Sequence, residues 1–141
     1  MSACEPRGSD PDGSKPVHCT VVVDGPKRFA ETDVITARVR FRCGSPGAQP
    51  LTLKLRLEKE TGEDKWGNSL WSAVSTKTFT LKGKDSVAPE LKYAEKAITI
   101  SCREGVFRTV VDWSRTSRGD KEGDNLISGS VRDPCKKLLD E

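Results

Sequence analysis

Apolar and polar side chains alternate with a period of two along much of this 141-residue chain. The clearest case spans residues 34–43, where apolar residues take every second position and Thr36 and three arginines take the others. Residues 51–58 repeat the pattern with a leucine at every second position. A helix would scatter these side chains around its circumference, whereas a strand places alternate side chains on one face. Both segments are therefore predicted to be half-buried β-strands.

Further extended segments are predicted at residues 17–24, 70–82, 97–103, 106–114 and 126–132. Turn-forming residues separate the strands, as in residues 44–47, 60–64 and 117–125. About seven short strands joined in this way predict an all-β fold, an immunoglobulin-like antiparallel β-sandwich. With 34% hydrophobic residues the chain can build one modest core. We place this domain at residues 17–135, after a disordered tether or linker at 1–16 and before a short C-terminal tail at 136–141.

Four cysteines on the predicted strands, Cys19, Cys43, Cys102 and Cys135, lie far apart in the sequence. Zinc sites need ligand pairs two to four residues apart, and no such pair is present. Two disulfides, and hence an oxidising compartment, are the interpretation that we favour. The alternative is a cytosolic protein with four buried free thiols.

The strand register suggests which cysteines pair. Folding 17–24 against 34–43 as a hairpin places Cys19 opposite Cys43, and folding the last three segments as a meander brings Cys135 beside Cys102. We therefore predict the bonds Cys19–Cys43 and Cys102–Cys135. Sequence alone does not choose among the three possible connectivities, and Cys43–Cys102, a bridge between the sheets, is the alternative.

Cys4 is the fifth cysteine. The segment Ser2-Ala3-Cys4 resembles the last three positions of a bacterial lipobox, with Met1 in the place of the usual leucine. Our hypothesis is that Cys4 is lipidated and that the Pro-, Gly- and Asp-rich stretch behind it is a flexible tether. The alternative is an ordinary disordered N-terminus with a spare cysteine.

Cys102, Gly105, the pair Phe107-Arg108 and the closing Cys135 together resemble a pattern in small secreted proteins of actinomycetes. Those proteins are disulfide-bonded β-sandwiches, mostly of unknown function. Cys4 and the threonine-rich segment at 70–82 lie outside the pattern. The resemblance implies a fold and a location, secreted or anchored on the outer face of the cell membrane, and it implies no activity.

Residue types suited to catalysis are sparse. His18 is the only histidine, and its position on the first strand favours an outward-facing residue over a general base. No glycine-rich phosphate loop follows a strand. Residues 119–125 carry acidic oxygens, but their spacing differs from a calcium-binding loop and favours a solvated hairpin loop. We therefore predict a non-enzymatic protein with no cofactor and no metal.

Positive charge is concentrated in residues 34–57, which contain no acid. If the two strands pair directly, one exposed surface carries Arg38, Arg40, Arg42, Lys54 and Arg56 as candidate ligand-binding residues. If the strands belong to opposite sheets of a sandwich, the patch divides. The alternative is a solubilising face neutralised by nearby acids. The net charge of +3 and the absence of interleaved aromatics argue against nucleic acid.

Tryptophan offers a second candidate contact. Trp66 precedes Gly67 and Asn68 and is expected to be exposed, where it can stack on a sugar or anchor a protein partner. Trp71 and Trp113 are expected in the core.

These observations predict an extracytoplasmic, non-catalytic recognition module that binds an unidentified protein or an anionic envelope component, with membrane contact only through a lipid anchor at Cys4. The alternative is an inhibitor of an extracellular enzyme, presenting a disulfide-clamped loop near Cys43 or Cys135. A third possibility is an enzyme, which would require a deep pocket lined by carboxylates.

Overall fold

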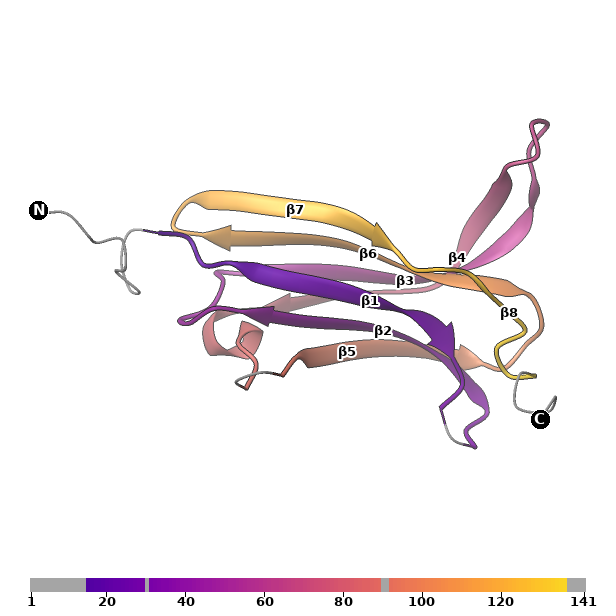
Figure 1. Ribbon diagram of the computed structural model, residues 1–141, viewed down its shortest axis with the longest axis horizontal. Helices are drawn as coiled ribbons and strands as arrows, with labels where there is room; N and C mark the ends of the chain where they lie inside the picture. The colour runs from indigo at the N-terminus through magenta and orange to yellow at the C-terminus, as the bar shows by residue number, and fades with distance from the viewer. Residues whose placement is uncertain (1–14, 30, 90–91, 137–141) are drawn as a thin grey trace, which may run out of the picture.

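The computed structural model describes residues 15–29, 31–89 and 92–136. Within them the chain forms eight strands and one short 3-10 helix (Figure 1). The elements are β1 (Cys19–Lys27), β2 (Val34–Cys43), β3 (Leu51–Glu63), β4 (Ser69–Leu81), η1 (Gly83–Ser86), β5 (Ala94–Ser101), β6 (Val106–Ser117), β7 (Asp120–Ile127) and β8 (Val131–Arg132). The predicted all-β class is confirmed. Cys4 and most of the predicted tether and tail lie outside the described residues.

The strands form two antiparallel sheets that pack face to face as a sandwich (Figure 1). One sheet has the order β1-β2-β5, and the other has the order β4-β3-β6-β7, with β8 also paired to β6. An antibody constant domain divides its strands four and three, with the fourth strand in the sheet of the first two. Here β4 pairs with β3 instead, so the first sheet has three strands and the second has more.

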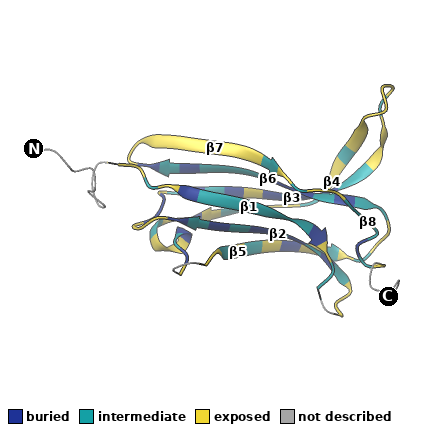
Figure 2. Cartoon of the chain, in the orientation of Figure 1, coloured by how far each residue is buried: buried dark blue, intermediate teal, exposed yellow. Residues whose placement is uncertain are grey.

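The core lies between the inner faces of β2, β3 and β6 (Figure 2). Alternate residues of β2 are buried from Ile35 to Cys43, and the alternating leucines of β3 are fully buried. The two clearest alternating patterns in the sequence therefore mark the two central strands, as predicted. Burial of each of the larger side chains among them, the leucines of β3 and Ile35, Val39 and Phe41 of β2, contributes about 1.5–3 kcal/mol relative to its exposure.

Both predicted disulfides are present. Cys19 and Cys43 are register partners on β1 and β2 and are nearly fully buried. Cys102 and Cys135 are bonded and only half-buried. The first bond lies within one sheet, whereas the second joins the end of β5 to the segment that follows β8, a strand of the other sheet.

The predicted meander of the last three segments is wrong. β5 pairs with β2, while β6 pairs with β3 and β7, so β5 and β6 lie in different sheets. The pairing of Cys102 with Cys135 is nevertheless correct, because β8 pairs with the first residues of β6 and brings Cys135 back to the end of β5.

The long loop predicted at 117–125 is also wrong. The chain turns at Arg118 and Gly119, both with positive φ, and then continues directly into β7. Two positive-φ residues in a row characterise the tight turns that suit the twist of a hairpin. All residues from 120 to 125 are exposed, so this strand lacks the apolar alternation that would have revealed it. The predicted last strand at 126–132 is split between the end of β7 and β8.

β3 and β4 form a long hairpin that leaves the sandwich and projects from one end of it (Figure 1). Their register shifts between Leu57 and Glu58 and again between Glu60 and Gly62. Such bulges bend a strand and increase its twist, which explains why the hairpin turns away from the body at this point. The chain reverses at residues 64–68, slightly later than the turn predicted at 60–64.

Candidate functional site

The tip of the β3–β4 hairpin is organised by one carboxylate. Asp64 Oδ1 accepts hydrogen bonds from the backbone N–H of Trp66 and of Asn68, both at 2.9 Å. The backbone N–H of Gly67 donates to the Asp64 carbonyl at 3.0 Å, and the Asp64 N–H donates to the Asn68 carbonyl at 2.8 Å. The hydrogen bond from the Asn68 N–H is the largest influence on the pKa of Asp64 and lowers it; burial opposes this effect, the Trp66 N–H adds to it, and the pKa lies below its usual value. Four hydrogen bonds therefore fix a five-residue turn.

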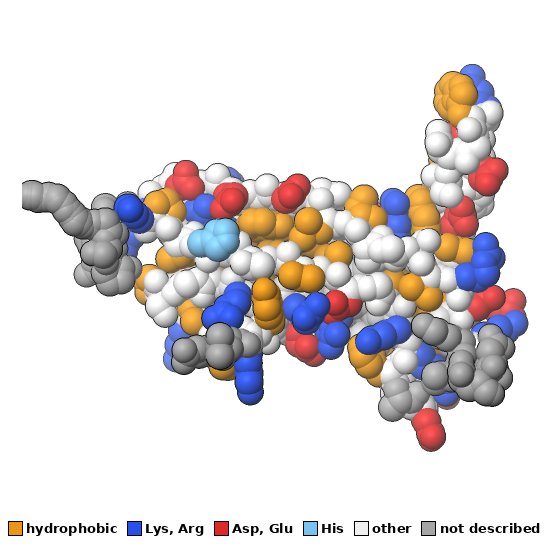
Figure 3. All heavy atoms as spheres, in the orientation of Figure 1, with side chains coloured by type: hydrophobic (Ala, Val, Ile, Leu, Met, Phe, Trp, Pro, Cys, Tyr) orange, Lys and Arg blue, Asp and Glu red, His pale blue; other side chains and the backbone are white. Residues whose placement is uncertain are grey.

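Trp66 stands at the outer end of this turn with 74% of its surface exposed, which agrees with the expectation from sequence. The Lys65 ammonium lies 4.7 Å from the centre of the indole ring. Gly67 follows with a φ of +84°, a conformation that favours glycine and lets the chain turn sharply behind the indole. The tip thus presents an aromatic ring beside a cation (Figure 3).

A charged network supports the base of the hairpin on the outer face of the larger sheet. Glu58 accepts hydrogen bonds from Arg56 Nε at 3.1 Å and from Arg108 Nε at 2.8 Å. Arg108 also lies over the ring of Trp71, with 4.2 Å between the guanidinium carbon and the ring centre. The expectation that Trp71 is a core residue is therefore wrong: it shares the outer face with Glu60, its register partner. Trp113 does pack against the core, although it is only partly buried.

The five predicted basic residues do not share one surface. Arg38, Arg40 and Arg42 lie on β2 in the three-stranded sheet, whereas Lys54 and Arg56 lie on β3 in the other sheet. The five cations therefore do not form one continuous patch. Because the two strands belong to opposite sheets of the sandwich, the positive charge is divided between two outer faces.

Most of these cations are also neutralised locally. Asp24 accepts hydrogen bonds from Arg38 Nε at 2.7 Å and from Arg40 Nη2 at 2.9 Å. Burial pulls the pKa of Asp24 upward, but the hydrogen bonds from Arg40 and Arg38 outweigh it and lower the pKa overall. Arg56 pairs with Glu58 and Asp112 on the other face. Arg42 lies 5.9 Å from the ring centre of Tyr93, and Arg40 lies 5.8 Å from it.

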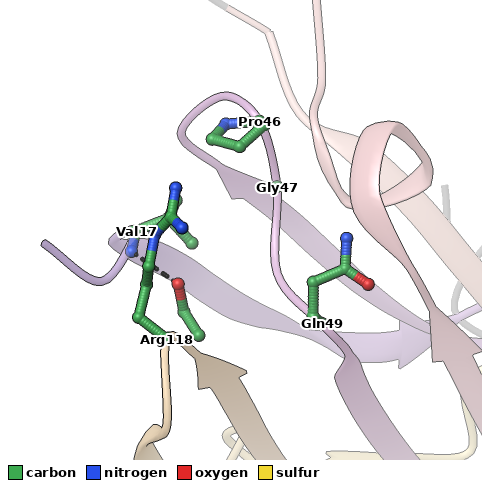
Figure 4. A pocket seen from close by; sticks show the side chains of 6 residues that line it. Val17, Pro46, Gly47, Gln49 and Arg118 are labelled. Carbon is green, nitrogen blue, oxygen red and sulfur yellow. Dashed lines mark hydrogen bonds between the residues drawn. The ribbon is translucent and has the colours of Figure 1, made fainter. Parts of the chain in front are cut away.

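Two cavities among the described residues are alternative candidate sites. The first, of about 200 Å³, is lined by Val17, Pro46, Gly47, Gln49, Ser117 and Arg118 (Figure 4). The backbone N–H of Val17 donates to the Ser117 hydroxyl across it at 3.0 Å. Its lining contains no carboxylate, so it is not the acid-lined pocket that an enzyme hypothesis required.

The second cavity, of about 180 Å³, lies beside the bond between Cys102 and Cys135. Its two carboxylates are already engaged, because Asp133 accepts a hydrogen bond from the Gly105 N–H at 2.8 Å and Glu104 forms an ion pair with Lys136. These contacts fix the chain around the disulfide and do not form an acid–base pair.

The two remaining candidates from the sequence, His18 and residues 119–125, do not form a catalytic or metal site. His18 is exposed at the start of β1, with its Nε2 atom 3.5 Å from the Thr20 hydroxyl. Residues 119–125, proposed as a calcium candidate, belong mostly to β7, where the three acids lie along one face of the strand and the Arg115 guanidinium pairs with Asp120 and Glu122. Within the described residues no cluster of three metal-ligating side chains occurs.

Sequence reasoning missed the role of Asp64. An aspartate that opens a turn and accepts the N–H two residues later is a known local motif, so the segment Asp64-Lys65-Trp66-Gly67-Asn68 carried the signal. Glu58 between two arginines had no such signal, because Arg108 comes from a distant strand.

No protein-family model and no curated protein matches this chain. Among solved structures, the sporulation control protein Spo0M from Bacillus subtilis shows a partial likeness, with 11% identity and a TM-score of 0.30. The match covers 83% of this chain and 51% of that one, so the present chain spans about half the length of Spo0M.

Proposed function

We propose that this protein is an extracytoplasmic, non-catalytic recognition module that contacts a protein partner through the tip of the β3–β4 hairpin. The observation that carries the proposal is the exposed indole of Trp66 on a turn held by Asp64. A large aromatic side chain at the outer end of a projecting hairpin contributes nothing to the core, yet it is the residue type most enriched at binding hot spots.

The rigidity of the turn supports this proposal. A side chain loses conformational freedom when it binds, and a turn that is already ordered reduces that cost. The hydrogen bonds to Asp64 order the backbone on both sides of Trp66 before any partner arrives. Lys65 beside the ring favours a partner pocket with an apolar floor and an acidic rim.

We prefer a protein partner to an anionic envelope component. The arginines of β2 and β3, which are the candidates for binding anions, are divided between two sheets and are largely paired with acids. The inhibitor alternative needs a protruding loop beside a disulfide. The segment after Cys43 exposes Gly44, Ser45 and Pro46 and is then buried at Gly47 and Ala48, so the exposed stretch next to this disulfide is only three residues long.

The proposed location rests on the two disulfides, which are typical of proteins that fold outside the reducing cytosol. Among the described segments, no helix has the length and apolar character needed to cross a bilayer. Secretion, or anchoring through a lipidated Cys4, is the expectation that follows. Mass spectrometry of the protein from its native host tests the anchor, and an unmodified Cys4 in the mature chain would disprove it.

The recognition proposal is tested by affinity capture from the native cell envelope, with the disulfide-intact protein as bait and Trp66→Ala in parallel. Tyr93→Ala is the matched control, because Tyr93 is also an exposed aromatic but lies on the body. We expect captured proteins to be lost with Trp66→Ala and retained with Tyr93→Ala. Equal capture by all three baits would refute the tip as the contact, and capture of only anionic polymer would favour the rejected ligand class.

A further inference from the structure

We propose that the outer edge of β1 is a second docking site, which takes an extended basic segment of a partner protein as a fourth strand of the three-stranded sheet. This site is independent of the hairpin tip. In the sandwich β1 packs mainly over β6 and contacts β7 only marginally, so most of β7 is left uncovered by the described residues. Figure 2 shows the result, since β7 is exposed along most of its length.

The backbone of β1 has unused hydrogen-bonding groups along this edge. Antiparallel pairs alternate between wide pairs, which exchange hydrogen bonds, and narrow pairs, whose N–H and C=O groups point away from each other. Cys19 and Cys43 form a narrow pair, with 4.0 Å between their Cα atoms, and the next pair along is bonded from the Gly44 N–H to the His18 carbonyl at 2.9 Å. By alternation, the backbone groups of Val21 and Val23 point away from β2.

Within the described residues, β1 pairs with β2 alone, so the outward groups of Val21 and Val23 have no strand to bond. The side chains of these valines are also only half-buried, although their register partners Phe41 and Val39 are buried almost completely. An unpaired and partly apolar strand edge is a template for the addition of another strand.

The inner face of β7 forms an acidic rim beside this edge. Asp120, Glu122 and Asp124 are register partners of inward-facing residues of β6, and cross-strand partners share a face. The Arg115 guanidinium forms ion pairs with two of the three acids, at 3.1 Å from Asp120 and 2.6 Å from Glu122. One positive charge faces three negative ones, so the rim keeps a net negative charge. Figure 3 shows acidic side chains along the rim over β7 and hydrophobic side chains beside them along β1.

The negative charge of the rim favours a strand that carries basic side chains. A strand added to β1 would direct alternate side chains toward β7, where lysine or arginine would meet the acids. The open stretch is bounded by the contact of Val17 with Ser117 and by the close approach of Val131 to Gly25. A second copy of β1 fits less well, because its alternate residues Cys19, Val21 and Val23 bring no positive charge to the rim.

The probe is a capped peptide of about seven residues in which lysine alternates with valine. Amide hydrogen exchange followed by NMR is the readout. We expect the peptide to slow exchange of the Val21 and Val23 amides by about tenfold or more, because these groups become hydrogen-bonded. The Val22 amide faces β2 and should change little. The same peptide with methylated backbone nitrogens keeps its charge but cannot pair, and it should have no effect.

A charge reversal tests the rim. Asp124→Lys should weaken peptide binding about fivefold, whereas Glu63→Lys, the same change on the exposed hairpin, should not. Equal binding of the methylated peptide would overturn the proposal by showing attraction of charge alone. Absence of exchange protection at millimolar peptide would also overturn it, and so would protection of Val21 and Val23 that grows with protein concentration without peptide, which would make a second copy the occupant.

Discussion

The same two strands build both the interior of the body and the projecting hairpin, and they are held by different interactions in the two places. In the body, β3 places Leu51, Leu53, Leu55 and Leu57 in the core with no exposed surface. Beyond the bulge at Leu57 and Glu58, β3 passes through half-buried residues and is exposed from Thr61 to Glu63, where the turn around Asp64 takes over. A strand stabilised by burial tolerates little change, whereas one stabilised by local hydrogen bonds leaves its outward side chains available for contact.

Leu55→Ala should have the largest effect. Removal of a fully buried leucine side chain leaves a cavity and should lower the free energy of unfolding by about 3–5 kcal/mol. Urea denaturation measures the loss. Leu70→Ala is the matched change on the hairpin, where 46% of the leucine is exposed, and it should cost far less. Similar losses for the two variants would mean that the hairpin is packed as tightly as the body.

Removal of the half-buried disulfide should have the next largest effect. The double variant Cys102→Ser with Cys135→Ser opens a loop that spans a sequence separation of 33 residues, and it should cost about 3–4 kcal/mol. The hairpin lies outside this loop, so amide exchange at Trp66 and Asn68 should be unchanged in the native state. Faster exchange at the tip than in the unaltered protein would show that the disulfide also orders the hairpin.

Acid should loosen the turn at the hairpin tip. The folded state lowers the pKa of Asp64 from its ordinary value of 3.8. The stability that the ionised Asp64 contributes is therefore complete above pH 3.8 and is lost as the pH falls through the lower folded pKa. NMR shifts of the Trp66 and Asn68 amides should follow this titration. Asp64→Ala should show the loosened shifts at neutral pH and no titration, and a titration that persists in this variant would assign it to another group.

Trp66→Ala should have the smallest effect on stability, within about 0.5 kcal/mol, because an exposed side chain leaves no cavity. Thermal unfolding checks this value. Taken with the capture experiment above, a stable variant that no longer binds would separate the two regions cleanly. A loss above about 1 kcal/mol would instead make the indole part of the structural framework.

The sequence predicted the sandwich well where strands have one buried face. The alternation in 34–43 and 51–58 identified β2 and β3, and the hairpin register placed Cys19 opposite Cys43 as observed. It failed at β7, whose residues from 120 to 125 are exposed on both faces and show no alternation of apolar with polar side chains. It also failed at the meander, because the choice of partner for β5 depends on which sheet covers its apolar face, and the strand itself does not encode that choice.

The candidate site was only partly predictable. Exposure of Trp66 followed from its neighbours Gly67 and Asn68, but the projection of the hairpin depends on two bulges that no residue pattern marked. Arg38 and Arg40 meet Asp24 only because of the register between β2 and β1. Arg108 and Glu58, which also pair, are 50 positions apart in the sequence. Such neutralisation of charge is a property of the assembled sheets.

The positions of the two disulfides have a consequence for cleavage of the backbone. A protease that cuts after the exposed Lys65 would separate residues 1–65, which contain the bond between Cys19 and Cys43, from residues 66–141, which contain the bond between Cys102 and Cys135. Neither of these two disulfides would then join the fragments, yet the pairings of β2 with β5, β3 with β4 and β3 with β6 all run between them. The chain is therefore divided at the tip of the β3–β4 hairpin into two internally cross-linked halves suited to fragment complementation.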